Sequence, residues 1–127
     1  MEELTANVNW LAVGVGTVAA YGLGMLWFSP MLFGKVWAKG SHDITPPESL
    51  PIAAMLWQLL GTFLLAWLVG VTAKNEALLT IVLALICFAI LQAAGGLFSQ
   101  KSKGAASVDA GYVVAMGVIM IVAQGVF

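Results

Sequence analysis

Four long apolar segments dominate the chain and restrict it to helical membrane architectures. They cover residues 8–28, 51–71, 77–98 and 105–127. Each is long enough to cross the hydrocarbon core of a bilayer, which takes about 20 apolar residues in a helix. Because the polar breaks after the second and third segments are short, neighbouring helices must run antiparallel and pack side by side. The sequence therefore predicts an all-α bundle of four antiparallel transmembrane helices, with residues 1–127 forming a single domain.

The composition supports the membrane class and excludes several functions. Hydrophobic residues make up 61% of the chain and charged residues 9%, whereas a soluble domain has about 45–50% and about 25%. We therefore expect the lipid bilayer to be a partner of this protein. The net charge is −1 and the chain contains no arginine, so it offers no basic surface for nucleic acid. The single cysteine, Cys87, has no second thiol with which to form an intrachain disulfide or a cysteine-based metal site.

All the lysines lie outside the apolar segments, and most of them mark one side of the membrane. Lys35 and Lys39 follow the first segment, Lys101 and Lys103 follow the third, and Lys74 alone lies on the opposite side. The positive-inside rule places lysine-rich loops in the cytoplasm. We expect the first and third loops to be cytoplasmic, and both termini and the second loop to lie outside.

The first loop contains a shorter helical pattern. Ser29 followed by Pro30 suits a helix start and Gly40 suits a helix end, which predicts a helix over about residues 30–39. Its side chains separate onto two faces, with Leu32, Phe33, Val36 and Trp37 on one and Lys35 and Lys39 on the other. Such a helix lies in the membrane interface, with Trp37 as an anchor and the lysines toward headgroups. It could serve as an anchor alone, or as a lid or partner-docking element over the mouth of the bundle.

Asp109 is the only acidic residue inside the four segments, and other polar residues lie at a similar depth. A charged side chain costs about 2.5–3.5 kcal/mol at the centre of a membrane helix, which makes it a candidate functional residue. A rise of about 1.5 Å per residue puts one polar residue of each segment about 6–10 Å inside the lysine-bearing end. These residues are Tyr21, Gln58, Gln92 and Asp109. Tyr112 shares the face of Asp109 at i+3, and Trp57 lies a full turn inside its segment, where we expect it to pack against a helix or a pocket.

Three interpretations of this polar layer are open. It could be structural, because interhelical hydrogen bonds satisfy polar groups that lipid cannot. It could line a pocket that opens to the cytoplasm and holds an ion, a proton or a small amphipathic ligand, with Asp109 as its charged member. Asp109 could also be an exposed interfacial residue without a partner. Under the structural interpretation, Lys101 or Lys103 extends toward Asp109.

Small residues at a spacing of four predict close contacts between helices. Gly16, Ala20 and Gly24 recur along the first segment, and Gly111 and Ala115 repeat the spacing beside Asp109. These faces could all be used inside one bundle. A four-helix unit has little interior, however, so we expect some of them to pair protomers in a homo-oligomer, with a dimer favoured.

Two parts of the chain resemble a known family. They are NWLAV at residues 9–13 with LGMLWFSPMLFGKVW at 23–37, and DAGY at 109–112. Both resemble a family of small bacterial four-helix membrane proteins called domain of unknown function 1761. The resemblance implies a bacterial cytoplasmic-membrane protein and supplies no activity. It also implies asparagine as often as aspartate at position 109, which argues against obligatory proton chemistry there.

The sequence contains no pattern typical of an active site. It has no Ser-His-Asp set, no paired carboxylates inside the segments and no cluster of metal ligands. We therefore expect no enzyme, no cofactor and no metal. Our preferred hypothesis is an oligomeric transporter-like or small-ligand-binding bundle that uses the polar layer. The alternatives are an accessory or assembly subunit of a larger membrane complex, docked through Trp37, and a lipid- or hydrophobe-binding module.

Overall fold

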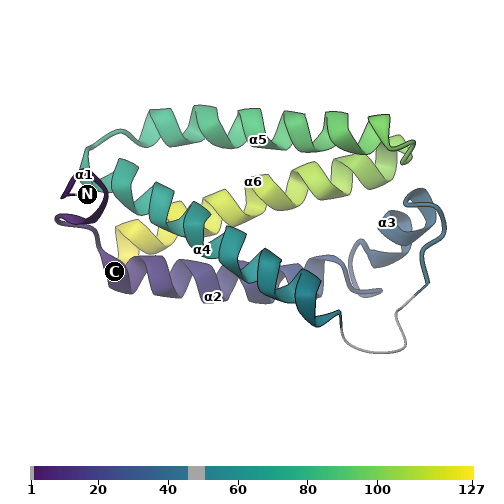
Figure 1. Ribbon diagram of the computed structural model, residues 1–127, viewed down its shortest axis with the longest axis horizontal. Helices are drawn as coiled ribbons and strands as arrows, with labels where there is room; N and C mark the ends of the chain where they lie inside the picture. The colour runs from purple at the N-terminus through teal and green to yellow at the C-terminus, as the bar shows by residue number, and fades with distance from the viewer. Residues whose placement is uncertain (1, 46–50) are drawn as a thin grey trace.

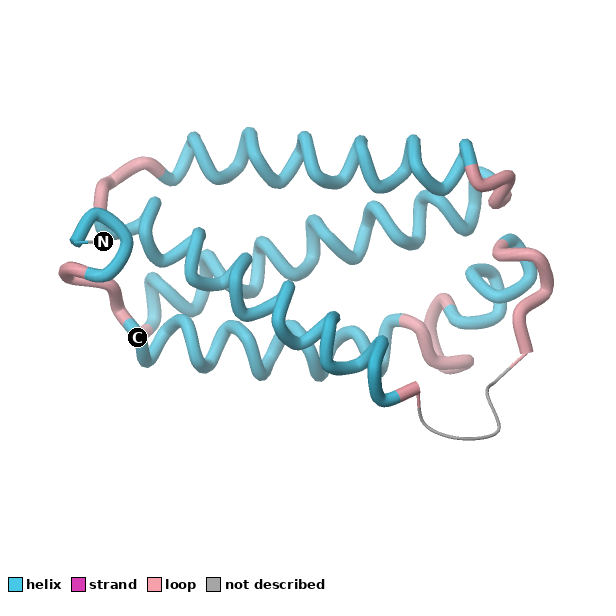
Figure 2. Tube along the Cα trace, in the orientation of Figure 1, coloured by secondary structure: helices cyan, strands magenta, loops and turns pink. Residues whose placement is uncertain are grey.

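The computed structural model describes residues 2–45 and 51–127, and all regular structure in these ranges is helical (Figure 2). Four of the helices are long and apolar enough to cross a membrane. They are α2 (Trp10–Trp27), α4 (Ile52–Lys74), α5 (Leu78–Phe98) and α6 (Lys103–Val126). Two short helices, α1 (Glu2–Thr5) and α3 (Gly34–Gly40), lie outside these spans. The all-helical class and the four membrane-length helices are thus confirmed.

The long helices run back and forth along the longest axis of the molecule, and both chain termini lie at the same end (Figure 1). Helix α6 packs against α2, α3, α4 and α5, and so forms the centre of the bundle. The largest fully buried side chains include Val13, Val69, Ile81 and Met120, one from each long helix. Helix α3 and the α5–α6 connection, which carry Lys35, Lys39 and Lys101, lie at the end of the molecule that is opposite the termini (Figure 1).

Two helix starts are fixed by side-chain caps. The Oδ1 atom of Asn9 accepts a hydrogen bond from the backbone N–H of Ala12 at 3.1 Å, so α2 begins at Trp10. The Oγ atom of Ser102 accepts from the N–H of Ala105 at 3.0 Å, so α6 begins two residues before the predicted residue 105. A polar side chain at an N-cap satisfies backbone donors that have no partner inside the helix.

Helix α3 begins at Gly34, so the predicted start near Pro30 is wrong. The chain first turns back on itself, and the N–H of Phe33 donates to the carbonyl of Trp27 at 3.0 Å while that of Gly34 donates to the carbonyl of Ser29 at 2.8 Å. A Cβ atom at position 34 would overlap the carbonyl groups of Phe28 and Ser29, so the turn requires glycine there.

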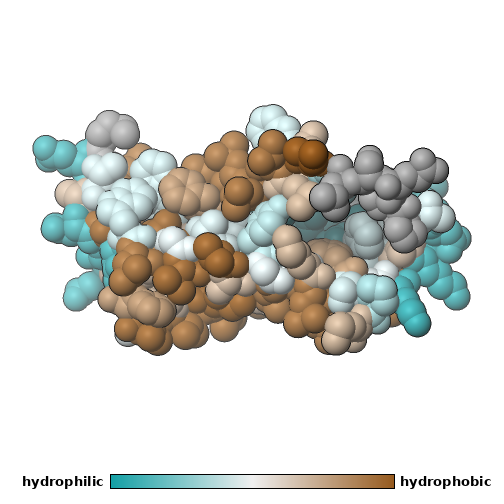
Figure 3. Space-filling model, turned by 90° about the horizontal axis from the view of Figure 1, so that it is seen from below, coloured by the Kyte–Doolittle hydropathy of each residue, from teal (hydrophilic) through white to brown (hydrophobic). Residues whose placement is uncertain are grey.

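The outer surface has an apolar middle and hydrophilic ends (Figure 3). Large hydrophobic side chains are exposed along all the long helices, as illustrated by Leu79, which is 85% exposed, and Phe98, which is 90% exposed. Monomeric soluble proteins do not leave so continuous an apolar surface in water. The surface therefore suits an integral membrane protein, with lipid covering the apolar middle.

Candidate functional site

Asp109 is buried, and its carboxylate accepts hydrogen bonds from two side chains that lie outside α6. Its side chain is 8% exposed. The Oδ1 atom accepts a hydrogen bond from Nε1 of Trp37 at 2.8 Å, and Oδ2 accepts one from Nζ of Lys101 at 2.9 Å. The same Nζ lies 5.6 Å from the centre of the Trp37 ring, so the three side chains contact one another. The interpretation of Asp109 as an exposed residue without a partner is therefore wrong, and Lys101 is the lysine that reaches it.

Helix α3 lies against the first turn of α6. The N–H of Ser102, the residue that caps α6, donates to the carbonyl of Gly40 at 2.9 Å. A Cβ atom at position 40 would overlap the side chains of Ser102 and Ala105, so the two helices approach closely there. Trp37, which we expected to anchor α3 in lipid, instead donates to Asp109 and is only partly exposed, because a buried carboxylate needs donors. Lys35 and Lys39 are exposed, as expected.

An aromatic cluster connects α2, α3 and α6. Phe28 packs edge-on against both Trp37, at 5.2 Å between ring centres, and Tyr112, at 5.3 Å. Nε1 of Trp27 donates to the carbonyl of Val108 at 3.0 Å. The hydroxyl of Tyr112 donates to the carbonyl of Ala20 at 2.7 Å. Rings and hydrogen bonds therefore join the end of α2 to the segment of α6 that carries Asp109.

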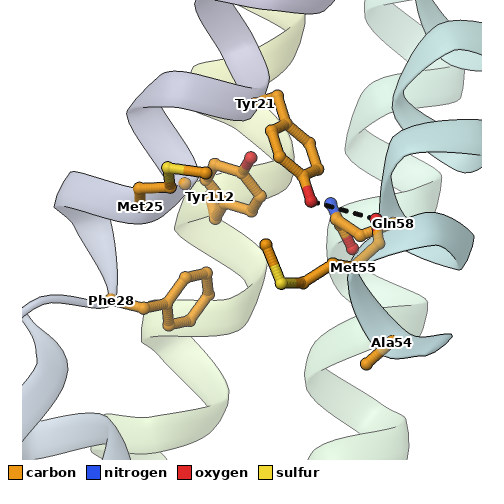
Figure 4. A pocket seen from close by; sticks show the side chains of 8 residues that line it. Tyr21, Met25, Phe28, Ala54, Met55, Gln58 and Tyr112 are labelled. Carbon is orange, nitrogen blue, oxygen red and sulfur yellow. Dashed lines mark hydrogen bonds between the residues drawn. The ribbon is translucent and has the colours of Figure 1, made fainter. Parts of the chain in front are cut away.

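The first cavity, here called the α2–α4 cavity, lies between α2, α4 and α6 and has a volume of about 300 Å³. Its lining is mostly apolar, with three hydrogen-bonding side chains (Figure 4), and consists of Tyr21, Gly24, Met25, Phe28, Ala54, Met55, Gln58 and Tyr112. The hydroxyl of Tyr21 donates to the carbonyl of Met55 at 3.0 Å and so crosses from α2 to α4. The structure thus brings together three members of the predicted layer, Tyr21, Gln58 and Tyr112.

The other two members of that layer line a different space. The α5–α6 pocket has a volume of about 210 Å³ and is lined by Leu91, Gln92, Gly95, Gly96, Ser99, Lys101 and Asp109. It lies where the end of α5 meets the start of α6. The single polar layer expected from helix depth is therefore divided between two sites that share only helix α6.

Trp57 joins neither site. Its side chain is 74% exposed and lies on the outer surface of α4 with Ala53, Leu56 and Leu60. Trp57 therefore lines a groove on the outside of α4 and not the cavity of the predicted layer, because the rotation of α4 turns Gln58, the next residue, toward that cavity. The sequence interpretation missed Met25, Phe28 and Met55. The i, i+4, i+7 spacing of Tyr21, Met25 and Phe28 was a signal that could have found the first two.

The small-residue face of α2 is used inside the chain. Gly16 faces Met120 of α6, and Gly24 faces the ring of Tyr112, where a Cβ atom would overlap the hydroxyl. Ala20 is fully buried between them. On α6, Gly111 faces Trp27, while Ala115 is partly exposed. These small residues therefore allow α2 and α6 to pack closely.

The charged groups at the sites offer no metal centre within the part of the chain that the structure describes, where no three His, Cys, Asp or Glu side chains come together. The arrangement can instead hold an ion pair at one site and an apolar molecule at the other.

No curated protein and no solved structure matches the chain. A family match covers residues 11–125, nearly the whole length, and it includes both cavities. The chain belongs to this family, which is described as Protein of unknown function (DUF1761).

Proposed function

We propose that this protein binds a small hydroxyl-bearing hydrophobe, taken up from the bilayer, in the α2–α4 cavity. The observation that carries the proposal is the cavity itself, with apolar walls from Met25, Phe28 and Met55 and a volume of about 300 Å³. This volume is at the lower end of the range for small-molecule sites, which are mostly apolar with a few placed polar groups.

The hydrogen bonds inside the cavity indicate which polar group the ligand carries. The hydroxyls of Tyr21 and Tyr112 both donate their protons to backbone carbonyls. A phenol oxygen has no second proton to give but keeps lone pairs that can accept. The tyrosines therefore favour a ligand with a hydroxyl or N–H donor. The side-chain amide of Gln58 can supply either role.

The route into the cavity runs through the apolar surface of the protein. Met25 is 61% exposed, and Ala54 and Gln58 are exposed as well, so the α2–α4 cavity is open at the side of the bundle. Gln58 lies in the seventh position of α4, about 10 Å along the helix. A molecule dissolved in the hydrocarbon core can therefore reach the cavity without passing the headgroups.

The position of Asp109 favours a ligand-binding function over ion or proton transport. The described residues that line the α2–α4 cavity are all uncharged. Asp109, the acidic residue of α6, lines the other site and is held by Trp37 and Lys101. A carboxylate with two donors is not free to carry an ion through the bundle.

We also propose the orientation that the lysines favour, in a bacterial cytoplasmic membrane. Lys35, Lys39, Lys101 and Lys103 occupy the end that would face the cytoplasm. Helix α3 would then lie in the cytoplasmic interface, with its exposed lysines toward headgroups and the exposed Val36 toward lipid.

Photolabelling tests the proposed site. The purified protein is incubated with a long-chain alcohol that carries a diazirine, irradiated and mapped by mass spectrometry. We expect label on α2 and α4 residues of the cavity. Ala54→Phe fills the cavity and should lower this labelling about tenfold, which corresponds to about 1.4 kcal/mol of binding free energy. Ala53→Phe is the matched control, because Ala53 faces the outer groove beside Trp57. Equal labelling of the two variants contradicts the proposal.

A further inference from the structure

The α5–α6 pocket combines an ion pair with an amide that lacks a partner. Lys101 and Asp109 form the ion pair at 2.9 Å. The side chain of Gln92 lines the same pocket and is exposed on α5. No hydrogen-bond partner of its amide lies within residues 2–45 and 51–127. The pocket thus has unused hydrogen-bonding capacity beside a charged pair.

The depth of Gln92 makes this unused capacity costly in a membrane. Gln92 lies six residues before Phe98, the last residue of α5, so it is about 9 Å inside the end of that helix. An amide left without a hydrogen bond in an apolar medium is strongly unfavourable. The medium around α5 is apolar, because the neighbouring Leu91 is 69% exposed. A group that is not among residues 2–45 and 51–127 must therefore satisfy the amide.

The polar groups of the pocket are arranged in the order of a glycerophospholipid. Ser99 and Lys101 lie at the end of the helix, Gln92 lies about two turns deeper, and the exposed side chains of α5 continue from there. In a glycerophospholipid the headgroup with its phosphate is outermost, the ester carbonyls come next, and the acyl chains follow. Lys101 has three N–H donors, of which one binds Asp109, so it can also bind a phosphate oxygen.

Asp109 adds selectivity for the headgroup. Its carboxylate has about four lone-pair sites and uses two of them for Trp37 and Lys101. A headgroup that carries both a phosphate and a primary ammonium matches the pair of opposite charges. We propose that the α5–α6 pocket binds a glycerophospholipid with a primary-ammonium headgroup, through phosphate on Lys101, ammonium on Asp109 and an ester carbonyl on Gln92. This site is separate from the α2–α4 cavity.

Lipid retention measured by native mass spectrometry tests this inference. The protein is reconstituted with phosphatidylethanolamine, phosphatidylcholine or phosphatidylglycerol and then released from detergent in the spectrometer. Phosphatidylethanolamine should be retained most, because the choline headgroup has no N–H and the glycerol headgroup has no cation. Gln92→Leu should lower its retention about tenfold, the loss of one hydrogen bond in an apolar environment.

Cys87→Leu is the matched control, since Cys87 is exposed on the same helix outside the pocket. Gln92→Leu places a leucine in a lipid-facing position, so the variant should fold. Equal retention of the three lipids overturns the inference, and so does equal retention by the two variants. Loss of a dimer in Gln92→Leu with unchanged lipid retention also overturns it, because a second copy would then be the partner of the amide. None of these outcomes depends on labelling of the α2–α4 cavity.

Discussion

Tyr112 and Asp109 lie one turn apart on α6, yet the fold satisfies them in different ways. Tyr112 is neutral, and its hydroxyl donates to a carbonyl of α2. Asp109 is charged and binds two side chains, one from α3 and one from the loop before α6. A neutral polar group in a membrane helix needs a single backbone acceptor and a close neighbour. A charge needs donors that reach it from the end of the bundle.

The same contrast separates the two cavities. The α2–α4 cavity keeps both of its tyrosine hydroxyls bound to the backbone and presents apolar walls. The α5–α6 pocket holds the Lys101–Asp109 ion pair beside an amide that has no partner among the described residues. One side of α6 therefore suits apolar ligands, and the other suits a charged headgroup. Phe28 connects the two sides, because it lines the first cavity and packs against Trp37.

Removing the Asp109 carboxylate should lower the free energy of unfolding more than any change at Tyr112 does. We expect Asp109→Ala to lower the free energy of unfolding by about 2–3 kcal/mol, because it removes two charge-assisted hydrogen bonds and leaves Lys101 unpaired. Helix α3 should also detach from α6. Denaturant titration in detergent measures the first effect, and the rate of trypsin cleavage after Lys35 and Lys39 measures the second.

Asp109→Asn separates the ion pair from the hydrogen bond with Trp37. The amide oxygen can still accept from the indole N–H, so this variant should lose less stability than Asp109→Ala and keep α3 more protected from trypsin. If Asp109→Asn and Asp109→Ala were cleaved at the same rate, Trp37 would not hold α3 through this residue. Trp57→Phe provides the control, because Trp57 is exposed on α4.

Filling the space between Gly24 and the Tyr112 ring should have an intermediate effect on stability. A Cβ atom at position 24 would overlap the Tyr112 hydroxyl, so Gly24→Ala must displace that ring. We expect a loss of about 1–2 kcal/mol in the free energy of unfolding, typical of overpacking. Gly22→Ala is the matched control on the same helix, because a Cβ atom there meets nothing within 4 Å. Equal effects of the two substitutions would show that helix propensity, and not the contact with Tyr112, sets the result.

The sequence predicted what depends on length and depth along a helix. The four membrane-length helices follow from runs of apolar residues, which are a local property. Depth also grouped Tyr21 with Gln58, and the i+3 spacing from Asp109 added Tyr112; these three residues share one cavity in the structure. Each of these features can be counted from the ends of a segment without knowledge of the packing.

The parts that the sequence did not predict depend on how helices rotate and how loops fold. Gln58 and Trp57 are adjacent, but only the rotation of α4 decides which of them faces the cavity. Gln92 and Asp109 lie at the expected depth in a second pocket, because α5 packs beside α6 and away from α2. The inward position of Trp37 follows from the turn that precedes Gly34, which residue types alone did not show.

Removing the hydroxyl of Tyr112 should have the smallest effect on stability. A neutral hydroxyl bound to a backbone carbonyl contributes less than a paired charge. We expect Tyr112→Phe to lower the free energy of unfolding by about 0.6 kcal/mol, the average for an interhelical hydrogen bond in a membrane bundle. The carbonyl of Ala20 keeps its bond within α2, so no acceptor is left unpaired. Denaturant titration of Tyr112→Phe and Asp109→Ala under the same conditions measures the difference between their free energies of unfolding. A loss for Tyr112→Phe as large as that for Asp109→Ala would show that the ring position, and not the charge, fixes the end of the bundle.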